Sequence, residues 1–101
     1  MRHYYEIVKD FVKDSADASE YLRVSLEEYE NDGNLDAFLK AIRTVANVQG
    51  GITKLAQKTN LNRQHLYRSL SPNGNPTIKT IDLILNSLGL KLTITAKQKA
   101  S

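Results

Sequence analysis

Residues 53–70 read TKLAQKTNLNRQHLYRSL and decide the fold that we expect for this chain. Apolar side chains recur at helical spacing on both sides of Asn60, which indicates two short helices joined by a tight turn. Such a turn requires a residue at positive φ, where glycine has no steric cost and asparagine is the best tolerated residue with a Cβ atom. We therefore predict that Asn60 keeps the turn and that the chain bends there as in a helix-turn-helix. The core-facing residues would be Ile52, Leu55, Ala56, Leu61, Leu66 and Leu70.

The outward side of the second predicted helix is polar and contains no acid. Asn62 can cap this helix, which leaves five residues outside: Arg63, Gln64, His65, Tyr67 and Arg68. Gln64 can form two hydrogen bonds with adenine, and Arg63 or Arg68 can do the same with guanine or hold a phosphate. This pattern favours DNA binding by the second helix.

Charge is distributed unevenly along the chain, whose formal net charge is +3. Residues 15–36 contain seven acids and one base, whereas residues 37–81 contain seven bases and no acid. The basic segment favours an anionic partner, although ordinary solvated helix faces would give the same pattern. Within it, Thr53 and Lys54 begin the first helix of the pair, where free N–H groups and the helix dipole favour a phosphate.

Some of these polar residues allow a second interpretation. His65 is a lone histidine on a helix surface, which is more often a solvated side chain than a ligand. Tyr67 can lean into the core or reach DNA. Asn73 and Asn75 lie in SPNGNP (71–76), where they could meet phosphate but are equally good turn formers, and we favour the turn.

Apolar periodicity predicts four further helices. The first covers residues 3–13. The second is capped within SADAS (15–19) and ends near NDGN (31–34), and it pairs in antiparallel fashion with a third that Asn34 caps and two glycines end. Thr77 caps the last, which Gly89 ends. Its inward residues would be Ile78, Ile81, Ile84, Leu85 and Leu88.

The segment LKLTIT, residues 90–95, alternates apolar and polar residues as a β-strand does. A single strand needs a partner for its N–H and C=O groups, and the chain offers no second convincing strand. We therefore expect a homodimer through the C-terminal strand.

Other classes of protein are disfavoured. There is no cysteine, and His3 and His65 are far apart in sequence, so we expect no metal site and no cofactor. No glycine-rich phosphate loop or nucleophile motif is present, which argues against an enzyme. No apolar run approaches the roughly 20 residues of a membrane span. The mixed acids and bases at the N-terminus contain no apolar signal core, so we expect a cytoplasmic location.

Residues 51–92, GITKLAQKTNLNRQHLYRSLSPNGNPTIKTIDLILNSLGLKL, resemble the addiction-module antidote proteins, which are antitoxins with a Cro/CI-type helix-turn-helix. The resemblance covers about residues 18–94 and weakens over residues 1–14. It implies an all-α, lambda-repressor-like bundle of about five helices with a short C-terminal β-strand. The implied domains are a helical appendage over 1–17, a DNA-binding domain over 18–95 with its helix-turn-helix at 51–70, and a flexible tail over 96–101.

The resemblance also implies a function. Such an antitoxin binds double-stranded operator DNA, represses its own operon and neutralises a RelE/ParE-like toxin. Gln64 and Arg63 would be the principal base readers, with His65 and Arg68 alongside. Phosphate contacts would fall to Thr53, Lys54 and Asn62. The family usually has glycine at the position of Asn60, a departure that concerns only local rigidity.

The sequence leaves more than one candidate for the surface that would face a toxin. The acidic stretch from Asp17 to Asp36 would complement a basic toxin, but the same acids would also keep a helix pair soluble. The aromatic N-terminal segment with Tyr4, Tyr5 and Phe11 could be the anchor instead, or fold back on its own subunit. Two other functions fit the sequence: a prophage-type transcriptional regulator without a toxin, and a purely protein-binding module.

Overall fold

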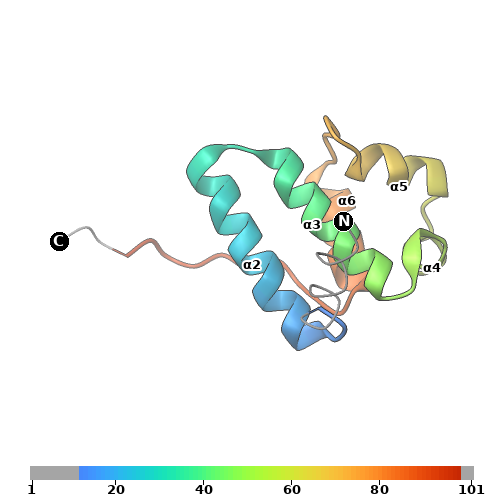
Figure 1. The fold of residues 1–101 in the computed structure, drawn as a ribbon, viewed down its shortest axis with the longest axis horizontal. Coiled ribbons are helices and arrows are strands. Elements are labelled where there is room, and N and C mark those ends of the chain that lie inside the picture. Colours follow the sequence, from blue (N-terminus) through green and yellow to red (C-terminus); the bar gives the residue numbers. More distant parts are fainter. Residues whose placement is uncertain (1–11, 99–101) are drawn as a thin grey trace, which may run out of the picture.

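The computed structural model describes residues 12–98, in which all regular secondary structure is helical. Its five helices are α2 (Ser15–Asp32), α3 (Leu35–Val48), α4 (Gly51–Thr59), α5 (Arg63–Leu70) and α6 (Ile78–Ser87). Helix α3 is central: α2 lies along one side of it, and α4 and α5 lie on the other (Figure 1). Helix α6 packs on α4. The all-α prediction is confirmed for the described part of the chain.

The predicted helix at 3–13 lies outside the described residues except for its last two positions, which form a bend and not a helix. Helix α2 begins directly after this bend. Its cap is Asp14, whose side chain accepts a hydrogen bond of 2.9 Å from the Asp17 N–H, so the predicted cap within SADAS was wrong by at least one residue. Asp14 is the better cap because its carboxylate also interacts favourably with the positive end of the helix.

Helices α2 and α3 form the predicted antiparallel pair (Figure 1). Gly33 ends α2 with a φ of 72°, a left-handed conformation that glycine adopts without strain. Asn34 then caps α3, and its side chain accepts a hydrogen bond of 3.2 Å from the Ala37 N–H. The NDGN turn therefore stops one helix and starts the next within two residues.

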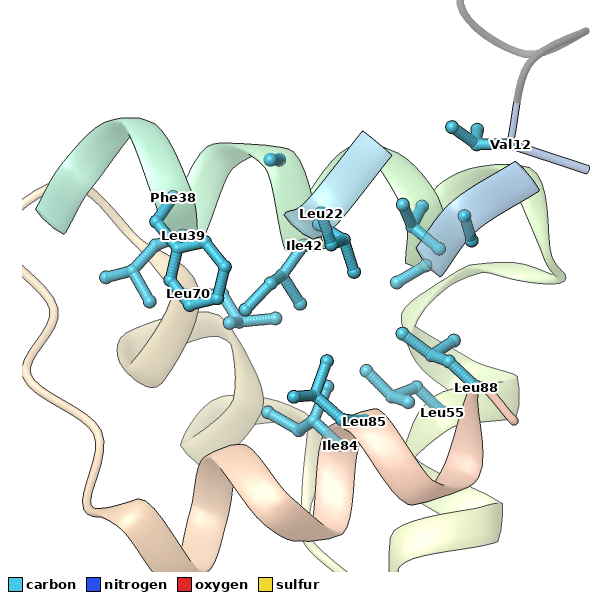
Figure 2. Packing of buried hydrophobic residues seen from close by; sticks show 14 of the residues in the cluster. Val12, Leu22, Phe38, Leu39, Ile42, Leu55, Leu70, Ile84, Leu85 and Leu88 are labelled. Atoms are coloured by element: carbon cyan, nitrogen blue, oxygen red, sulfur yellow. The ribbon is translucent and has the colours of Figure 1, made fainter. Parts of the chain in front are cut away.

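The hydrophobic core lies around α3 and includes buried side chains from all five helices, among them Leu22 of α2 and Leu55 of α4 (Figure 2). Ile42 of α3, Leu70 of α5 and Ile84 of α6 are fully buried there. Removing each such side chain from water stabilises the fold by about 1.5–3 kcal/mol. The contacts also fix the rotation of α5 about its own axis, which determines the residues that it exposes.

Two predicted features of the C-terminal third differ from the structure. Ile78 was expected to face inward but is 76% exposed. Ile78 lies on the same face of the helix as the buried residues of α6. It is, however, the first residue of α6, where no neighbouring helix covers its side chain.

The strand predicted for residues 90–95 is absent from the part of the chain that the structure describes. Leu90 and Leu92 pack against the core, whereas Ile94 is 96% exposed and the segment continues away from the helices (Figure 1). A strand needs a neighbouring strand to pair its backbone groups, and residues 12–98 of one chain provide none.

The beginning of α2 and the end of α6 meet although they are far apart in sequence. The Ser15 hydroxyl donates a hydrogen bond of 3.3 Å to the Leu88 carbonyl oxygen. Gly89 leaves room for this contact, because a Cβ atom there would lie 2.3 Å from the Ser15 Oγ. Val12 is fully buried, and its carbonyl accepts a hydrogen bond of 3.3 Å from the Gln49 side chain. No helix in the described range is both long enough and apolar enough to cross a membrane.

Candidate nucleic-acid interface

The turn between α4 and α5 has the geometry that the sequence predicts. Asn60 has a φ of 64°, and its N–H donates a hydrogen bond of 3.0 Å to the Ala56 carbonyl, which ends α4. The buried Thr59 hydroxyl strengthens the turn: it donates to the Leu55 carbonyl at 2.8 Å and accepts from the Leu61 N–H at 3.3 Å. Asparagine therefore replaces the more usual glycine without loss of the turn.

Helix α5 begins at a well-formed cap. The Asn62 side-chain oxygen accepts a hydrogen bond of 2.6 Å from the His65 N–H, as the sequence predicts. Leu66 and Leu70 are fully buried beneath the helix. Their burial turns the opposite side of α5 toward solvent.

We call the exposed side of this helix the outer face of α5, which consists of Arg63, Gln64, Tyr67 and Arg68. Tyr67 is 53% exposed and thus points outward, which resolves the two orientations that the sequence left open. His65 is only half-buried and lies at the edge of this face, so its predicted outward position is confirmed in part. Asn62, Arg63, Gln64 and Tyr67 together line a shallow surface depression.

The amino end of α4 has the features of an anion site. Gly50 precedes the helix with a φ of 119° and provides no side-chain cap, so the first N–H groups of α4 lack the partner that a capping side chain would supply. The methylene chain of Lys54 lies against Gly50: a Cβ atom built at Gly50 would be only 2.4 Å from Lys54 Cδ. Thr53 and Lys54 are both exposed. Both residues lie on the first turn of α4. Their hydroxyl and ammonium groups would therefore be close to an anion that the helix dipole favours there.

One base in the acid-free segment has a structural role that was not predicted from the sequence. Arg43 of α3 is half-buried, and its Nη1 donates a hydrogen bond of 2.5 Å to the Leu70 carbonyl at the end of α5. Its guanidinium is thus engaged within the fold. The position of Arg43 in the sequence does indicate that it faces inward. It follows Leu39 by four residues and Ile42 by one, and so lies within the apolar stripe of its helix.

The loop after α5 is a turn, as we favoured from the sequence. Asn73 has a φ of 68°, and its N–H donates a hydrogen bond of 2.8 Å to the Asp36 side chain. The Gly74 N–H donates to the Ser71 carbonyl at 2.8 Å. A Cβ atom at Gly74 would lie 2.4 Å from the Ser69 carbonyl oxygen, so only glycine fits this approach. The Asp36 carboxylate beside Asn73 makes this loop a poor site for phosphate.

The described residues contain no group of three or more His, Cys, Asp or Glu side chains placed to hold a metal ion. Several of the polar side chains singled out from the sequence lie on α4, on α5 or at the cap between them. Of the residues singled out from the sequence, the structure brings Asn62, Arg63, Gln64 and Tyr67 into one depression. Arg68 and the amino end of α4 are exposed on the same pair of helices.

Comparison with known proteins gives a family for this chain. The family described as "probable addiction module antidote protein" matches residues 3–96. A relative from Haemophilus influenzae, called "Uncharacterized protein", is 28% identical over 90 residues, which are 88% of this chain and 92% of the relative. No solved structure gives a significant match. Because the family match extends over nearly the whole sequence, the chain belongs to the family of probable addiction module antidote proteins.

Proposed function

We propose that this protein is a sequence-specific DNA-binding antitoxin of a type II toxin–antitoxin module, which represses its own operon and neutralises a RelE/ParE-like toxin. Membership of the antidote family supports the antitoxin role. The observation that carries the DNA-binding role is the outer face of α5, a polar surface without acids that the turn at Asn60 and the core below hold outward. In this proposal residues 18–95 form a lambda-repressor-like domain with its helix-turn-helix at 51–70.

Helix α5 would read bases from the major groove, which is wide enough to admit an α-helix. Gln64 is suited to adenine, whose N6 and N7 it can bond together, and Arg63 is suited to the O6 and N7 of guanine. Arg68 and Tyr67 lie on the same outer face and would contact the sugar-phosphate backbone or thymine methyl groups. The half-buried His65 would contribute from the edge of the surface.

Phosphate contacts would position α5 in the groove. The amino end of α4 provides N–H groups that no capping side chain occupies, beside Thr53 and Lys54. Asn62 uses its side-chain oxygen as the helix cap, which leaves its amide NH₂ group free to donate to a phosphate oxygen. Arg43 is excluded from this set because it already binds the end of α5.

We further propose that the protein acts as a homodimer. Two copies would place their α5 helices in successive major grooves about 34 Å apart on a two-fold-related operator. The extended segment after Gly89 supports this, because its backbone groups from residue 91 to 98 make no hydrogen bonds to backbone groups of other described residues. The same segment from a second copy could supply the missing partner by strand pairing. The exposed Ile94 would then be covered.

A gel-shift assay on the DNA upstream of the protein's own gene tests the repressor role. It should be run with scrambled competitor at about 0.15 M salt, where non-specific contacts are weakened. We expect a shift that the scrambled competitor does not remove. A shift that the scrambled competitor removes would contradict sequence-specific binding.

Co-expression with the adjacent reading frame tests the antitoxin role separately. We expect the neighbouring protein to co-purify with this chain at a fixed ratio and to be toxic when expressed alone. A specific DNA shift without such a partner would instead indicate a stand-alone regulator.

A further inference from the structure

A groove of about 540 Å³ runs between α2 and α3. Of these two helices, α2 lies along the side of α3 away from α4 and α5 (Figure 1). Its wall on α2 is formed by one face of that helix, from Asp17 through Val24 to Glu28, and its wall on α3 includes Ala37 and Ala41. Nothing in the DNA-binding proposal uses this surface.

The apolar lining of the groove is exposed at Val24 and Ala37, whereas Ala41 is buried. Val24 is 42% exposed, one of the few large apolar side chains of the described chain that are so accessible. Ala37 and Ala41 are one helical turn apart on α3, and their small side chains keep that wall low. A groove of this shape fits the apolar stripe of an incoming helix. The side chains of that stripe, at positions i, i+3, i+4 and i+7, would lie along the groove and contact Val24.

The rim on α2 is acidic at both ends. Asp17 and Glu28 are exposed, and the ion pairs among the described residues are those of Arg23 with Glu20 and with Glu27, so neither Asp17 nor Glu28 takes part in one. Eleven residues separate these two acids, which corresponds to about 16 Å along the helix. A partner helix of about three turns would span both carboxylates.

Glu20, between them, is already engaged. Its carboxylate accepts hydrogen bonds of 3.0 and 2.5 Å from the Arg23 guanidinium, which lower the pKa of Glu20 below its ordinary value. The opposite rim carries a single base, Lys40 of α3. The charges on the two rims therefore differ in sign, and they would fix the direction in which a charged helix lies in the groove.

We propose that the α2–α3 groove is the docking site for the toxin, and that it receives a basic amphipathic helix of that protein. This inference rests on the proposed function and adds the surface and the chemistry of the partner segment. The partner helix places its apolar stripe on Val24 and Ala37. Its Lys or Arg side chains pair with Asp17 and Glu28, and a neutral or acidic residue faces Lys40.

The location of the groove has a consequence for regulation. Helices α2 and α5 lie on different sides of α3 (Figure 1). A helix bound between α2 and α3 would therefore leave the outer face of α5 uncovered. The toxin and the operator would therefore bind the same chain together.

The experiment is a calorimetric titration of the full-length protein with the toxin from the adjacent reading frame, at about 0.05 and 0.3 M salt. Three variants are compared with the wild type: Glu28→Lys, Glu30→Lys and Val24→Gln. The matched pair is Glu28→Lys and Glu30→Lys, because both change the net charge by +2 on exposed positions of α2, but only Glu28 lines the groove. Gel-shift of each variant on the operator serves as the folding control.

We expect Glu28→Lys to weaken toxin binding at least tenfold at low salt and less at high salt, with Glu30→Lys within about twofold of wild type. Val24→Gln should weaken binding severalfold at both salt concentrations, because it removes an apolar contact. Equal effects of the two lysine variants, with toxin binding intact in the wild type, would overturn the groove as the site while leaving the antitoxin function standing. A wild-type chain that bound no such protein would overturn the antitoxin function and this inference together.

Discussion

The Arg43 guanidinium of α3 donates its hydrogen bond to the Leu70 carbonyl at the last turn of α5, 2.5 Å away. This contact joins two residues that are 27 positions apart in sequence and belong to different helices. It also places a positive charge at the carboxyl end of α5, where the helix dipole favours it. The orientation of the proposed recognition helix thus depends on a residue of a different helix.

We predict that Arg43→Ala lowers the free energy of unfolding by about 1.5–3 kcal/mol, the range for a hydrogen bond to a charged group. Alanine has the higher helix propensity, so the loss would come from the contact and not from α3 itself. Urea denaturation followed by circular dichroism measures the change. Lys40→Ala on the same helix is the control and should have little effect, and equal losses in the two variants would contradict the assigned role of Arg43.

The left-handed conformation of Asn60 predicts an order of stability for substitutions. Asn60→Ala should cost about 1 kcal/mol, because alanine at positive φ is strained, whereas Asn60→Gly should be at least as stable as wild type. The same Asn→Ala change at Asn47, an exposed site within α3, should be neutral or slightly stabilising because alanine favours helix. Thermal melting of the three variants tests the order, and a stable Asn60→Ala variant would be inconsistent with the turn.

Gly74 and Gly33 provide a comparison between crowding and backbone strain. Gly33 has a positive φ and open space around it, so Gly33→Ala should cost about 1 kcal/mol from strain alone. At Gly74 a Cβ atom meets the backbone at Ser69 and Arg68, which cannot move without shifting the end of α5, so Gly74→Ala should cost about 1–3 kcal/mol. Chemical denaturation separates the two, and Gly74→Ala should also weaken operator binding.

Base and phosphate contacts should respond differently to mutation. Gln64→Ala should lose about 1–3 kcal/mol on the operator but little on scrambled DNA, because it removes a base contact. Lys54→Ala should weaken binding to both DNAs alike and reduce the salt slope by about one. Gln57→Ala, which removes the same amide from an exposed position on α4, is the control for Gln64. Unchanged operator preference in Gln64→Ala would remove this residue from the base readers.

The packing of the C-terminal segment indicates where to truncate the chain in a test of dimerisation. Leu90 and Leu92 contact the core, so a deletion that begins at residue 90 would also damage the fold. A chain that ends after Leu92 keeps these contacts and removes Ile94. We expect this shorter chain to be monomeric by light scattering, while the full chain is a dimer. A truncated chain that stays dimeric would exclude strand pairing beyond Leu92 as the main contact.

Local features of this fold follow from the sequence more readily than contacts between distant residues. The caps at Asn34, Asn62 and Thr77 and the turn at Asn60 were predicted correctly, because each depends on a few neighbouring residues. The role of Arg43 was missed, because its acceptor belongs to another helix and hydropathy alone assigns an arginine to solvent.

The two errors near the C-terminus have the same origin. Periodicity gives the phase of Ile78 in its helix but not how far the neighbouring helices extend over it. Alternation makes residues 90–95 capable of pairing as a strand, but pairing requires a second strand, which residues 12–98 of a single chain do not contain. At the candidate site, the exposed positions followed from the phase of Leu66 and Leu70, whereas the orientation of Tyr67 required the structure.

The hydrogen bond from Ser15 to Leu88 spans 73 positions and has a consequence for the order of events during synthesis. Helix α2 leaves the ribosome early, but its first turn acquires this partner only after α6 has been translated. The α2–α3 pair can form at once, since its turn is local and short. The nascent chain would therefore carry the α2–α3 surface before the bundle closes, and a partner that binds there would meet this chain while it is still being made.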